Sequence, residues 1–370
     1  LLILTLLCCS VVASAQTHFT RLSVDDGLPN ASIYRIVQDK EGYIWLGSTN
    51  TGLLRYNGYE LESFDVLPAS VSNNILVPDI DALLMDQNDQ LWIGSWGMGL
   101  SKVDTHTGTI SHYSDRPDSA VVLTSNYIQS LLLDQSGVLW IGTNKGLQRL
   151  LPDGTLQTVG AADAAQPLIN QRIWALAQTE DGTIWIATSS GLHQWTEQDG
   201  LSTAYQAFGQ HSVNNEMRTL FAHGNQLWVG GRSSLFQFER SSSAFRAVPF
   251  YDEALSPIVN VLESDRQGNL LVGTFDGIYK VSLTSGLFEP FADDRQLLPG
   301  INVRSLLVDR SGLLWVGSRE RGLFYGRHQP SAFTDLTSWG PQAAALVQIP
   351  NIPRASFRTN GQKCTPLLRR

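Results

Sequence analysis

Short apolar runs separated by polar turns fill most of the chain, and one arrangement of them recurs. An apolar run is followed by Asp-x-x-Gly, two further residues, a tryptophan, an aliphatic residue and glycine, and later by Gly-Leu. The first copy contains Asp39, Trp45 and Gly47. Because the runs are short, rich in β-branched residues and interrupted by Gly and Asp, they predict strands and not helices.

The tryptophan of each copy, called the anchor from here on, fixes the length of the repeat. Successive anchors are 47, 48, 45, 43, 43 and 44 residues apart. The fourth copy has Ala187 in place of the glycine after the anchor, the fifth copy is the most degenerate, and the sixth has leucine at the anchor position. The anchors are Trp45, Trp92, Trp140, Trp185, Trp228, Leu271 and Trp315.

This period, with four strands' worth of sequence in each unit, is typical of β-propeller blades. We therefore predict an all-β fold over residues 16–330, a seven-bladed β-propeller with four-stranded antiparallel blades. In each blade Asp-x-x-Gly would form a turn, and the glycine after the anchor would allow close backbone approach. The anchor would fill the wedge between blades and place its indole N–H on a backbone partner.

A closed ring also needs an outer strand for its last blade. Residues 17–23 precede the first blade in the position that outermost strands take before the later blades. We predict that this segment pairs with the seventh blade and closes the ring, which removes an exposed strand edge. Residues 331–334, which follow the seventh blade, are a competing candidate.

The two ends of the chain do not follow the repeat. Residues 1–15 form an apolar run ending in Ala-x-Ala, which predicts a signal peptide cleaved before Gln16 and hence an exported protein. The run has no starting Met and no basic residues, so we expect that it is truncated. Residues 331–370 lack the pattern and are predicted to be an irregular tail or the start of a missing downstream region.

Composition excludes several classes of partner and cofactor. The net charge of −8 over 370 residues argues against a nucleic-acid partner. The three cysteines, Cys8, Cys9 and Cys364, can build neither a disulfide framework nor a Cys-based zinc site. The seven histidines show no metal-ligand spacing, and no nucleotide-binding fingerprint is present. We predict neither a metal nor a cofactor.

Residues 39–48 and 134–143 resemble the repeat of the two-component regulator propeller family, and residues 23–33 resemble the opening segment of such sensors. The resemblance covers residues 17 to about 327. It implies a periplasmic ligand sensor, the ectodomain of an inner-membrane protein, often with two propellers in tandem. A tyrosine-rich β-sandwich, a membrane helix and a cytoplasmic histidine kinase or diguanylate cyclase would follow.

This chain departs from that plan, because its repeats make one ring only. Either it is a fragment of such a receptor or its gene has decayed. Any kinase or cyclase activity, and any membrane anchorage, would then belong to a missing downstream region. The resemblance also implies that the full-length receptor could form a homodimer. The chain itself is predicted to have no catalytic activity.

Three hypotheses of catalytic activity compete with that prediction. The repeated turn aspartates suggest calcium or acid catalysis, but one per blade cannot converge, so we interpret them as turn residues. Residues 181–185 resemble the Asp-box of sialidases, which would also need converging arginines. In a streptogramin-lyase-like propeller, His193 or His223 would be candidate catalysts, although both fit blade packing better. The arginines are scattered, although a few could meet at one mouth of the ring: Arg172, Arg218, Arg232, Arg304, Arg319 and Arg321.

Propellers bind ligands at the mouth of the central channel, with loops that vary on a constant frame. The segment between the glycine after the anchor and the next Gly-Leu varies most, and its amide, aromatic and charged residues would suit a polar or anionic sugar. The expected partner is therefore a small-molecule or oligosaccharide ligand. The alternative is that these residues are merely solvated. The predicted ligand-binding residues are Asn50, Trp96, Asn144, Lys145, Arg232, Asp276, Arg319 and Arg321.

Three functions therefore stay open at this point. The first is a non-catalytic ligand sensor, and the second is a periplasmic lyase or hydrolase that acts on a saccharide or lactone. The third is a platform for protein interaction.

Overall fold

A computed structural model describes most of the repeat region. It covers residues 19–64, 79–117, 119, 121–160, 168, 171–208, 212, 215–251, 257–291 and 294–328. The predicted signal peptide, the tail and the competing closing segment at 331–334 lie outside these residues. Within them, no helix is both long enough and apolar enough to cross a membrane.

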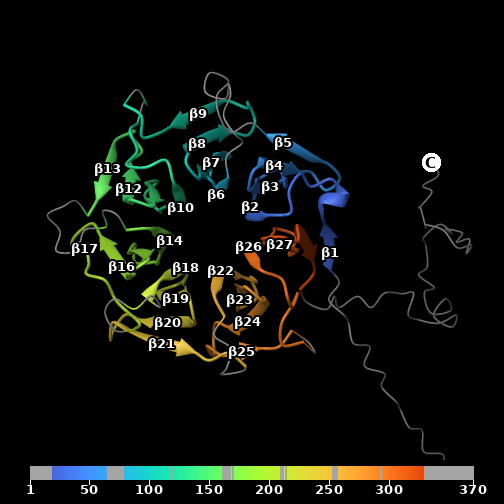
Figure 1. Cartoon of the computed structure of the whole chain (residues 1–370). Helices are drawn as coiled ribbons and strands as arrows, with labels where there is room; N and C mark the ends of the chain where they lie inside the picture. The colour runs from blue at the N-terminus through green and yellow to red at the C-terminus, as the bar shows by residue number, and fades with distance from the viewer. Residues whose placement is uncertain are drawn as a thin grey trace, which may run out of the picture. The chain divides into compact units, whose positions relative to one another are not determined.

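The described residues form seven four-stranded antiparallel sheets arranged in a ring, with a short 3₁₀ turn at Val24–Asp26 (Figure 1). This confirms the predicted seven-bladed propeller. The blades are numbered along the chain, and the strands of each are given from the innermost outward. Blade one is β2 (Ile33–Gln38), β3 (Ile44–Ser48), β4 (Gly52–Tyr56) and β5 (Leu61–Phe64); blade two is β6 (Ile80–Met85), β7 (Gln90–Ser95), β8 (Gly99–Asp104) and β9 (Ile110–Tyr113); blade three is β10 (Ile128–Leu133), β11 (Leu139–Thr143), β12 (Gly146–Leu150) and β13 (Leu156–Val159); blade four is β14 (Ile173–Gln178), β15 (Ile184–Thr188), β16 (Gly191–Thr196) and β17 (Gly200–Leu201). Blade five is β18 (Met217–His223), β19 (Gln226–Gly231), β20 (Leu235–Glu239) and β21 (Ala244–Val248); blade six is β22 (Val259–Ser264), β23 (Asn269–Thr274), β24 (Gly277–Ser282) and β25 (Phe288–Glu289); and blade seven is β26 (Val303–Val308), β27 (Leu314–Ser318), β28 (Leu323–Gly326) and β1 (Phe19–Leu22).

The last blade takes its outer strand from the N-terminal side of the chain. Strand β1 pairs antiparallel with β28, in the register Phe19↔Gly326 to Leu22↔Leu323. The innermost strand of blade seven, β26, also contacts β2 of blade one. At this junction the Arg310 side chain donates a hydrogen bond to the carbonyl oxygen of Asp39 at 2.6 Å. The first and last parts of the described chain are thus joined both by strand pairing and by blade packing.

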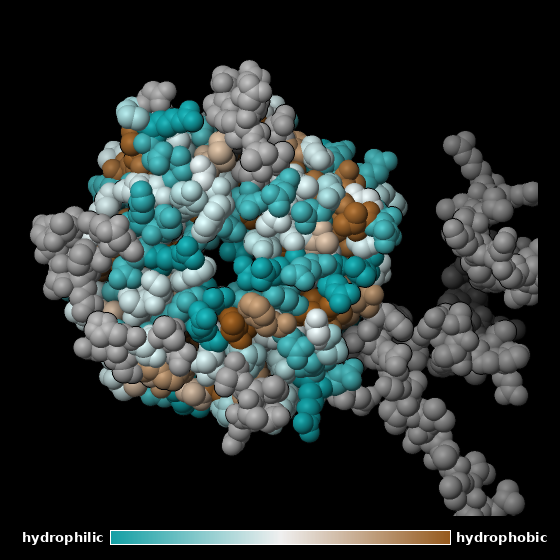
Figure 2. All heavy atoms as spheres, in the orientation of Figure 1, coloured by the Kyte–Doolittle hydropathy of each residue, from teal (hydrophilic) through white to brown (hydrophobic). Residues whose placement is uncertain are grey.

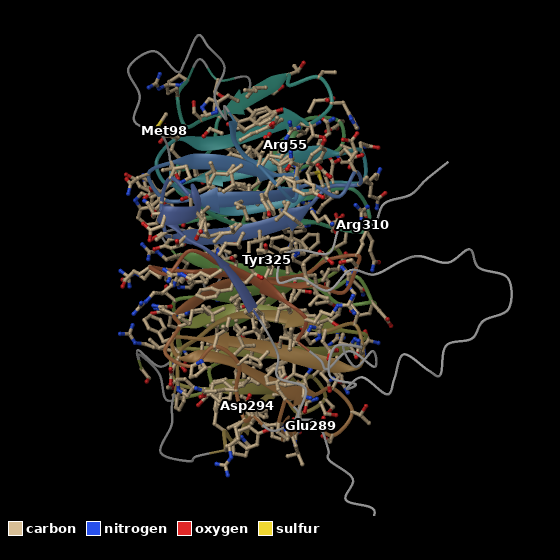
Figure 3. The ribbon with its side chains drawn as sticks, turned by 90° about the vertical axis from the view of Figure 1, so that its right-hand side faces the viewer. Arg55, Met98, Glu289, Asp294, Arg310 and Tyr325 are labelled. Carbon is tan, nitrogen blue, oxygen red and sulfur yellow. The ribbon has the colours of Figure 1, made fainter. Side chains whose placement is uncertain are left out.

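The propeller has two distinct faces. Seen from the side, Met98 in the β7–β8 loop lies at one face and Arg310 in the β26–β27 turn lies at the other (Figure 3). The face with the loops that follow the anchor strands is called the loop face here. The face with the Asp-x-x-Gly turns is called the turn face.

The anchors lock each blade to its own turn. Trp140 is fully buried, and its Nε1 donates to Asp134 Oδ2 at 2.7 Å. The other carboxylate oxygen of Asp134 accepts from the backbone N–H groups of Ser136 and Val138. The same indole–aspartate bond occurs in blades one, two and seven, whereas blade four uses Thr179. The turn role of the aspartates is as expected, but the indole partner is a side chain and not the predicted backbone group.

At six of the seven seams between blades, the glycine after the anchor has no room for a side chain. A Cβ atom on Gly94 would lie 2.5 Å from Cγ2 of Ile128, the first residue of the next blade's innermost strand. The equivalent residue of the next blade, an isoleucine or valine, meets the glycine at the other five seams. Blade four instead has Ala187, which packs in one cluster with the unbranched Met217. A flexible side chain there makes space for the extra methyl.

We expect Gly94→Ala to lower the free energy of unfolding by about 1–3 kcal/mol, because the new methyl overpacks a rigid seam. Adding Ile128→Met would copy the Ala187–Met217 pair of blade four and should recover most of that loss. Denaturant unfolding of the single and double variants measures both effects. If the double variant is less stable than Gly94→Ala alone, the overpacking explanation is wrong.

Blade six breaks the pattern at its anchor. Leu271 takes the place of tryptophan and lies between Glu263 and Lys280 on the neighbouring strands. Burial raises the pKa of the Glu263 carboxyl from 4.5 to about 7. His328 is only 3% exposed, and burial lowers its pKa while the nearby Asp265 charge opposes that shift. Leu271 itself packs in an apolar cluster with Phe291 and Val303, so these polar groups accompany apolar packing at this seam.

The shifted carboxyl predicts a pH dependence of stability. The unfolded chain releases the Glu263 proton near pH 4.5, whereas the folded chain holds it until about pH 7. Stability therefore falls as the pH rises through this window and is constant above it. Glu263→Gln should have little effect at pH 4 and should stabilise by about 2–3 kcal/mol at pH 8. Urea unfolding at both pH values tests this, with Glu320→Gln on an exposed loop as the control; equal effects at both pH values would contradict it.

Candidate functional site

Every innermost strand carries the same irregularity near its first residue. The strand pairing skips one residue in all seven blades, which marks a β-bulge directly after the residue that packs into the seam. A bulge bends the strand and redirects the side chain of the extra residue. These residues, called the bulge residues, are Tyr34, Asp81, Gln129, Trp174, Arg218, Asn260 and Arg304.

All seven bulge residues line a single cavity of about 290 Å³. Thr49 and Trp96 of the loops also line it, which places the cavity at the loop-face end of the central channel. On the face drawn in Figure 2, mostly hydrophilic residues border the central opening. Binding pockets for small molecules measure about 300–1,000 Å³, so this cavity fits a ligand of roughly one ring.

Buried charge is concentrated in this cavity. Burial lowers the pKa of the Arg304 guanidinium. Burial also raises the pKa of the Asp81 carboxyl, although the charges of Arg35 and Arg304 oppose that shift. Charged groups that have lost water gain more from a ligand than solvated ones do. The charged residues lining the cavity are Arg35, Arg172, Arg218, Arg304, Asp79 and Asp81.

Several polar atoms in the cavity wall have no protein partner. Among the described residues, Gln129 Oε1, Trp174 Nε1 and Arg304 Nε are buried and make no hydrogen bond. The Gln129 side chain belongs to a residue only 5% exposed. Buried polar groups in proteins are almost always hydrogen-bonded, so these three atoms would be satisfied by water or a ligand in the cavity.

Aromatic rings hold the arginines in position. The Arg172 guanidinium lies 4.8 Å from the centre of the Trp174 ring and 5.5 Å from that of Trp96. Arg218 lies 5.3 Å from the Trp174 ring, and Arg304 lies 4.7 Å from the ring of Tyr34. Such contacts fix a cation without using its N–H donors, which leaves those donors for a ligand.

Of the eight predicted ligand-binding residues, Trp96 alone lines this cavity. Arg172, Arg218 and Arg304 do meet at the mouth, which the sequence allowed for a few of the scattered arginines. The seven other predicted residues make contacts within or between the loops. The contacts are Asn50 N to Asp79 Oδ1, Ser125 Oγ to Asn144 Oδ1, Lys145 N to Thr143 Oγ1, Arg232 to Glu216, Gly300 N to Asp276 Oδ1, Arg319 to Glu320, and Arg321 N to Ser318 Oγ.

Sequence reasoning missed the bulge residues, although a signal for them exists. Each follows the apolar residue that opens the innermost strand and lies eleven residues before the anchor, or ten in blade five. This position differs in every blade except the two with arginine, while the preceding residue is always Ile, Val or Met. Simple strand alternation does not show that a bulge turns this side chain into the channel.

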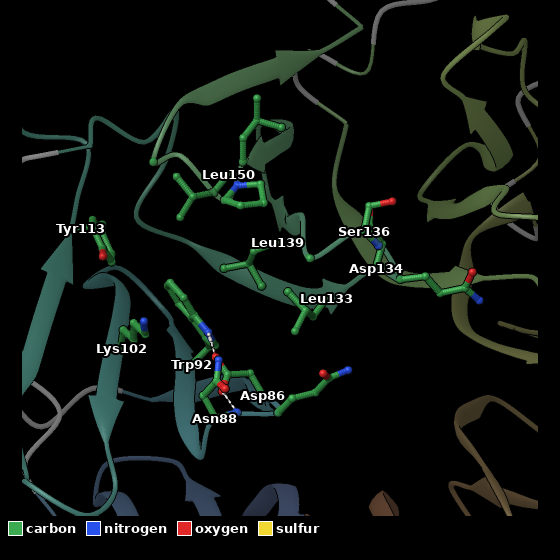
Figure 4. A pocket seen from close by; sticks show the side chains of 16 residues that line it. Asp86, Asn88, Trp92, Lys102, Tyr113, Leu133, Asp134, Ser136, Leu139 and Leu150 are labelled. Carbon is green, nitrogen blue, oxygen red and sulfur yellow. Dashed lines mark hydrogen bonds between the residues drawn. The ribbon is translucent and has the colours of Figure 1, made fainter.

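A second cavity, of about 600 Å³, lies between blades two and three on the turn face (Figure 4). Trp92 stacks on Tyr113 there, and the Lys102 ammonium lies 5.1 Å from the centre of the Trp92 ring. Trp92 Nε1 is bonded to Asp86. None of the buried, unpartnered side-chain atoms of the described residues lines this cavity. The channel mouth is therefore the stronger candidate.

The two candidate catalytic histidines lie away from the channel mouth. His193 is buried, its Nδ1 lies 3.1 Å from the carbonyl oxygen of Ser202, and burial lowers its pKa. His223 ends β18 and stacks on the ring of Phe221. Neither lines the cavity of the bulge residues. In the part of the chain that the structure describes, no three His, Cys, Asp or Glu residues group as metal ligands would.

Comparison with known proteins identifies the repeat. The model of the family described as two component regulator propeller matches residues 27–50, 122–145, 167–190 and 297–320. A curated protein named histidine kinase P4, from Formosa agariphila, is 26% identical over 120 residues, which are 32% of this chain and 8% of that protein.

Solved structures show the same fold. The extracellular domain of the putative hybrid two component system BT3049 of B. thetaiotaomicron has a TM-score of 0.70 at 20% identity, over 85% of this chain and 42% of that one. A streptogramin B lyase has a TM-score of 0.62 at 11% identity, over 84% of this chain and 97% of the lyase. The chain thus spans less than half the length of the receptor domain and a small part of the kinase. The chain is a seven-bladed β-propeller that carries the repeats of the two-component regulator propeller family.

Proposed function

We propose that this chain is the ligand-sensing propeller region of a bacterial signal-transduction receptor, with no catalytic activity of its own. In this proposal the propeller is exported to the periplasm and binds a small molecule or saccharide at the loop-face mouth of its channel. The receptor's output, a histidine kinase or diguanylate cyclase, would be carried by sequence outside this chain.

The relatives support the receptor part of the proposal. The repeat is that of the two-component regulator propeller, and the curated relative is a histidine kinase. The receptor domain from B. thetaiotaomicron has the same fold and is described as extracellular.

One observation carries the binding part of the proposal. Seven bulges turn the equivalent residue of each innermost strand into the same cavity, and three polar atoms there lack protein partners. A purely structural ring would gain nothing from buried, unpartnered donors and acceptors at its centre. A ligand with matching polar groups would satisfy them.

A propeller lyase or hydrolase is the second candidate, and Asp81 is the observation that favours it. Its carboxyl pKa is raised in a cavity lined by arginines, as in a general acid beside an anion-stabilising group. An enzyme and a sensor differ in whether the bound molecule is changed.

A thermal-shift screen of sugars and small metabolites tests the proposal. A ligand that stabilises the protein should lose its effect in Trp174→Ala, and the shift should persist when Trp195, which packs on Trp140 far from the channel, is replaced by phenylalanine. NMR of the ligand after overnight incubation should show it unchanged. A ligand that is converted to product would favour the lyase or hydrolase, and ligand shifts that survive Trp174→Ala would place the site elsewhere.

A further inference from the structure

The bulge residues divide the cavity into two chemically different sides. Around the ring, blades five, six and seven contribute Arg218, Asn260 and Arg304, and blades two and three contribute Asp81 and Gln129. Among the bulge residues, Arg218 and Arg304 of the first side offer charged N–H donors, and the second side offers acceptor oxygens, including the unpartnered Gln129 Oε1. Two further arginines, Arg35 and Arg172, line the cavity from outside the bulges, and the charge of Arg35 acts on Asp81. A ligand that matches both sides must carry an anion at one end and hydroxyl donors at the other.

The charge balance of the cavity limits the kind of anion that it can bind. The four arginines and two aspartates that line the cavity leave two positive charges. Glu216 offsets part of this charge, because its Oε1 lies 2.7 Å from Arg218 Nε while its Oε2 lies 3.4 Å from Arg232 Nη1 outside the cavity. The cavity therefore keeps a net positive charge, and the buried Arg304 Nε has no partner among the described residues. A single planar carboxylate suits such a guanidinium, with which it forms charge-assisted hydrogen bonds.

The volume of the cavity and its exposed apolar surface limit the size and shape of the rest of the ligand. The cavity of about 290 Å³ holds roughly one ring. Trp96 lies at its rim, is 41% exposed and is braced edge-on by Tyr127 at 5.0 Å. An exposed, fixed indole at a polar site can cover the apolar face of a ring ligand.

From this division of the cavity, resting on the proposed function, we infer that the channel mouth binds a sugar acid: one pyranose-sized ring with a carboxylate. The carboxylate contacts Arg304, with Arg218 nearby, and the hydroxyls donate to Asp81 and Gln129. A neutral sugar leaves the net positive charge of the cavity unmatched. A simple carboxylate leaves the acceptor side empty.

Calorimetric titration of the full chain with D-glucuronate and D-galacturonate tests this inference. D-glucose and D-galactose supply the same rings without the carboxylate, acetate supplies the carboxylate without the ring, and L-alanine supplies a carboxylate with an ammonium. We expect at least one uronate to bind with a Kd below about 1 mM and each comparison compound at least tenfold more weakly.

Three variants locate the contacts. Arg304→Gln keeps a planar polar side chain without the charge and should weaken uronate binding at least tenfold. Asp81→Asn should weaken it by less, because the amide oxygen still accepts from hydroxyls. Arg246→Gln, on the outer strand β21, should leave uronate binding unchanged. Thermal unfolding of each variant checks that the fold is retained.

The possible failures are distinguishable. If a neutral sugar or L-alanine binds as tightly as the uronates, and Arg304→Gln weakens that binding, the sugar-acid class is wrong and the channel-mouth site stands. If no uronate binds below about 1 mM, the inference is overturned, and the wider thermal-shift screen decides the proposed function. If uronate binding survives Arg304→Gln unchanged, both the inference and the proposed location fail.

Discussion

Trp140→Ala should lower the free energy of unfolding by about 3–5 kcal/mol, the usual cost of removing a fully buried tryptophan. Trp140 is 0% exposed and packs edge-on against Trp195 of the next blade, with ring centres 4.8 Å apart. Its loss would open the seam between blades three and four and leave Asp134 without its indole donor. Denaturant unfolding followed by circular dichroism measures the effect.

A matched pair of phenylalanine variants separates packing from hydrogen bonding. Trp140 and Trp228 are equally buried, but Trp228 Nε1 has no partner among the described residues. Both changes to phenylalanine shrink the ring, and only Trp140→Phe also breaks a hydrogen bond. We expect Trp140→Phe to cost about 1–2 kcal/mol more than Trp228→Phe. Equal costs would show that the indole–aspartate bond contributes nothing.

Removal of residues 1–23 should destabilise the ring about as strongly as Trp140→Ala, because it deletes β1 and exposes the edge of β28. Phe19 packs against the core of blade seven and Leu22 against that of blade one. Losing two such side chains costs about 3–6 kcal/mol, which corresponds to a Tm lower by roughly 10 °C.

Adding the missing strand back tests the reason for that loss. A peptide of residues 17–24 should raise the Tm of the shortened chain in a concentration-dependent way, and a scrambled peptide should not. An unchanged Tm after the deletion would mean that another segment, such as residues 331–334, can serve as the outer strand.

The frame of the molecule was predictable because its determinants repeat. Asp134 and Trp140 recur with their neighbours in register, and the spacing alone sets blade size and number. The pairing of residues 19–22 with β28 matches the place of this segment before blade one, where other blades have an outer strand. Repetition lets one weak local signal be read seven times.

The site was less predictable because its residues do not repeat. Tyr34, Asp81 and Arg304 share a position but no chemistry, and a backbone bulge, not a sequence motif, brings them together. The loops singled out for their variety mostly make internal contacts, as the bond from Gly300 N to Asp276 shows. Trp96, the aromatic member of that set, does line the cavity.

The repeated frame and the variable lining of the cavity are connected by two adjacent residues in each blade. Ile128 fills the seam against Gly94, and its neighbour Gln129 faces the channel. The constant residue holds the strand in place while the next residue varies freely in chemistry. A rigid frame with one variable position per blade is well suited to recognition, since the binding groups are held before the ligand arrives.

We propose that this propeller binds its ligand at the channel mouth. A crystal structure of the chain with the compound that gives the largest thermal shift tests it most directly. We expect ligand density among the bulge residues, with an anionic group on Arg304 and a ring against Trp96. Density confined to the cleft between blades two and three, or to the outer loops with an empty channel mouth, would contradict it.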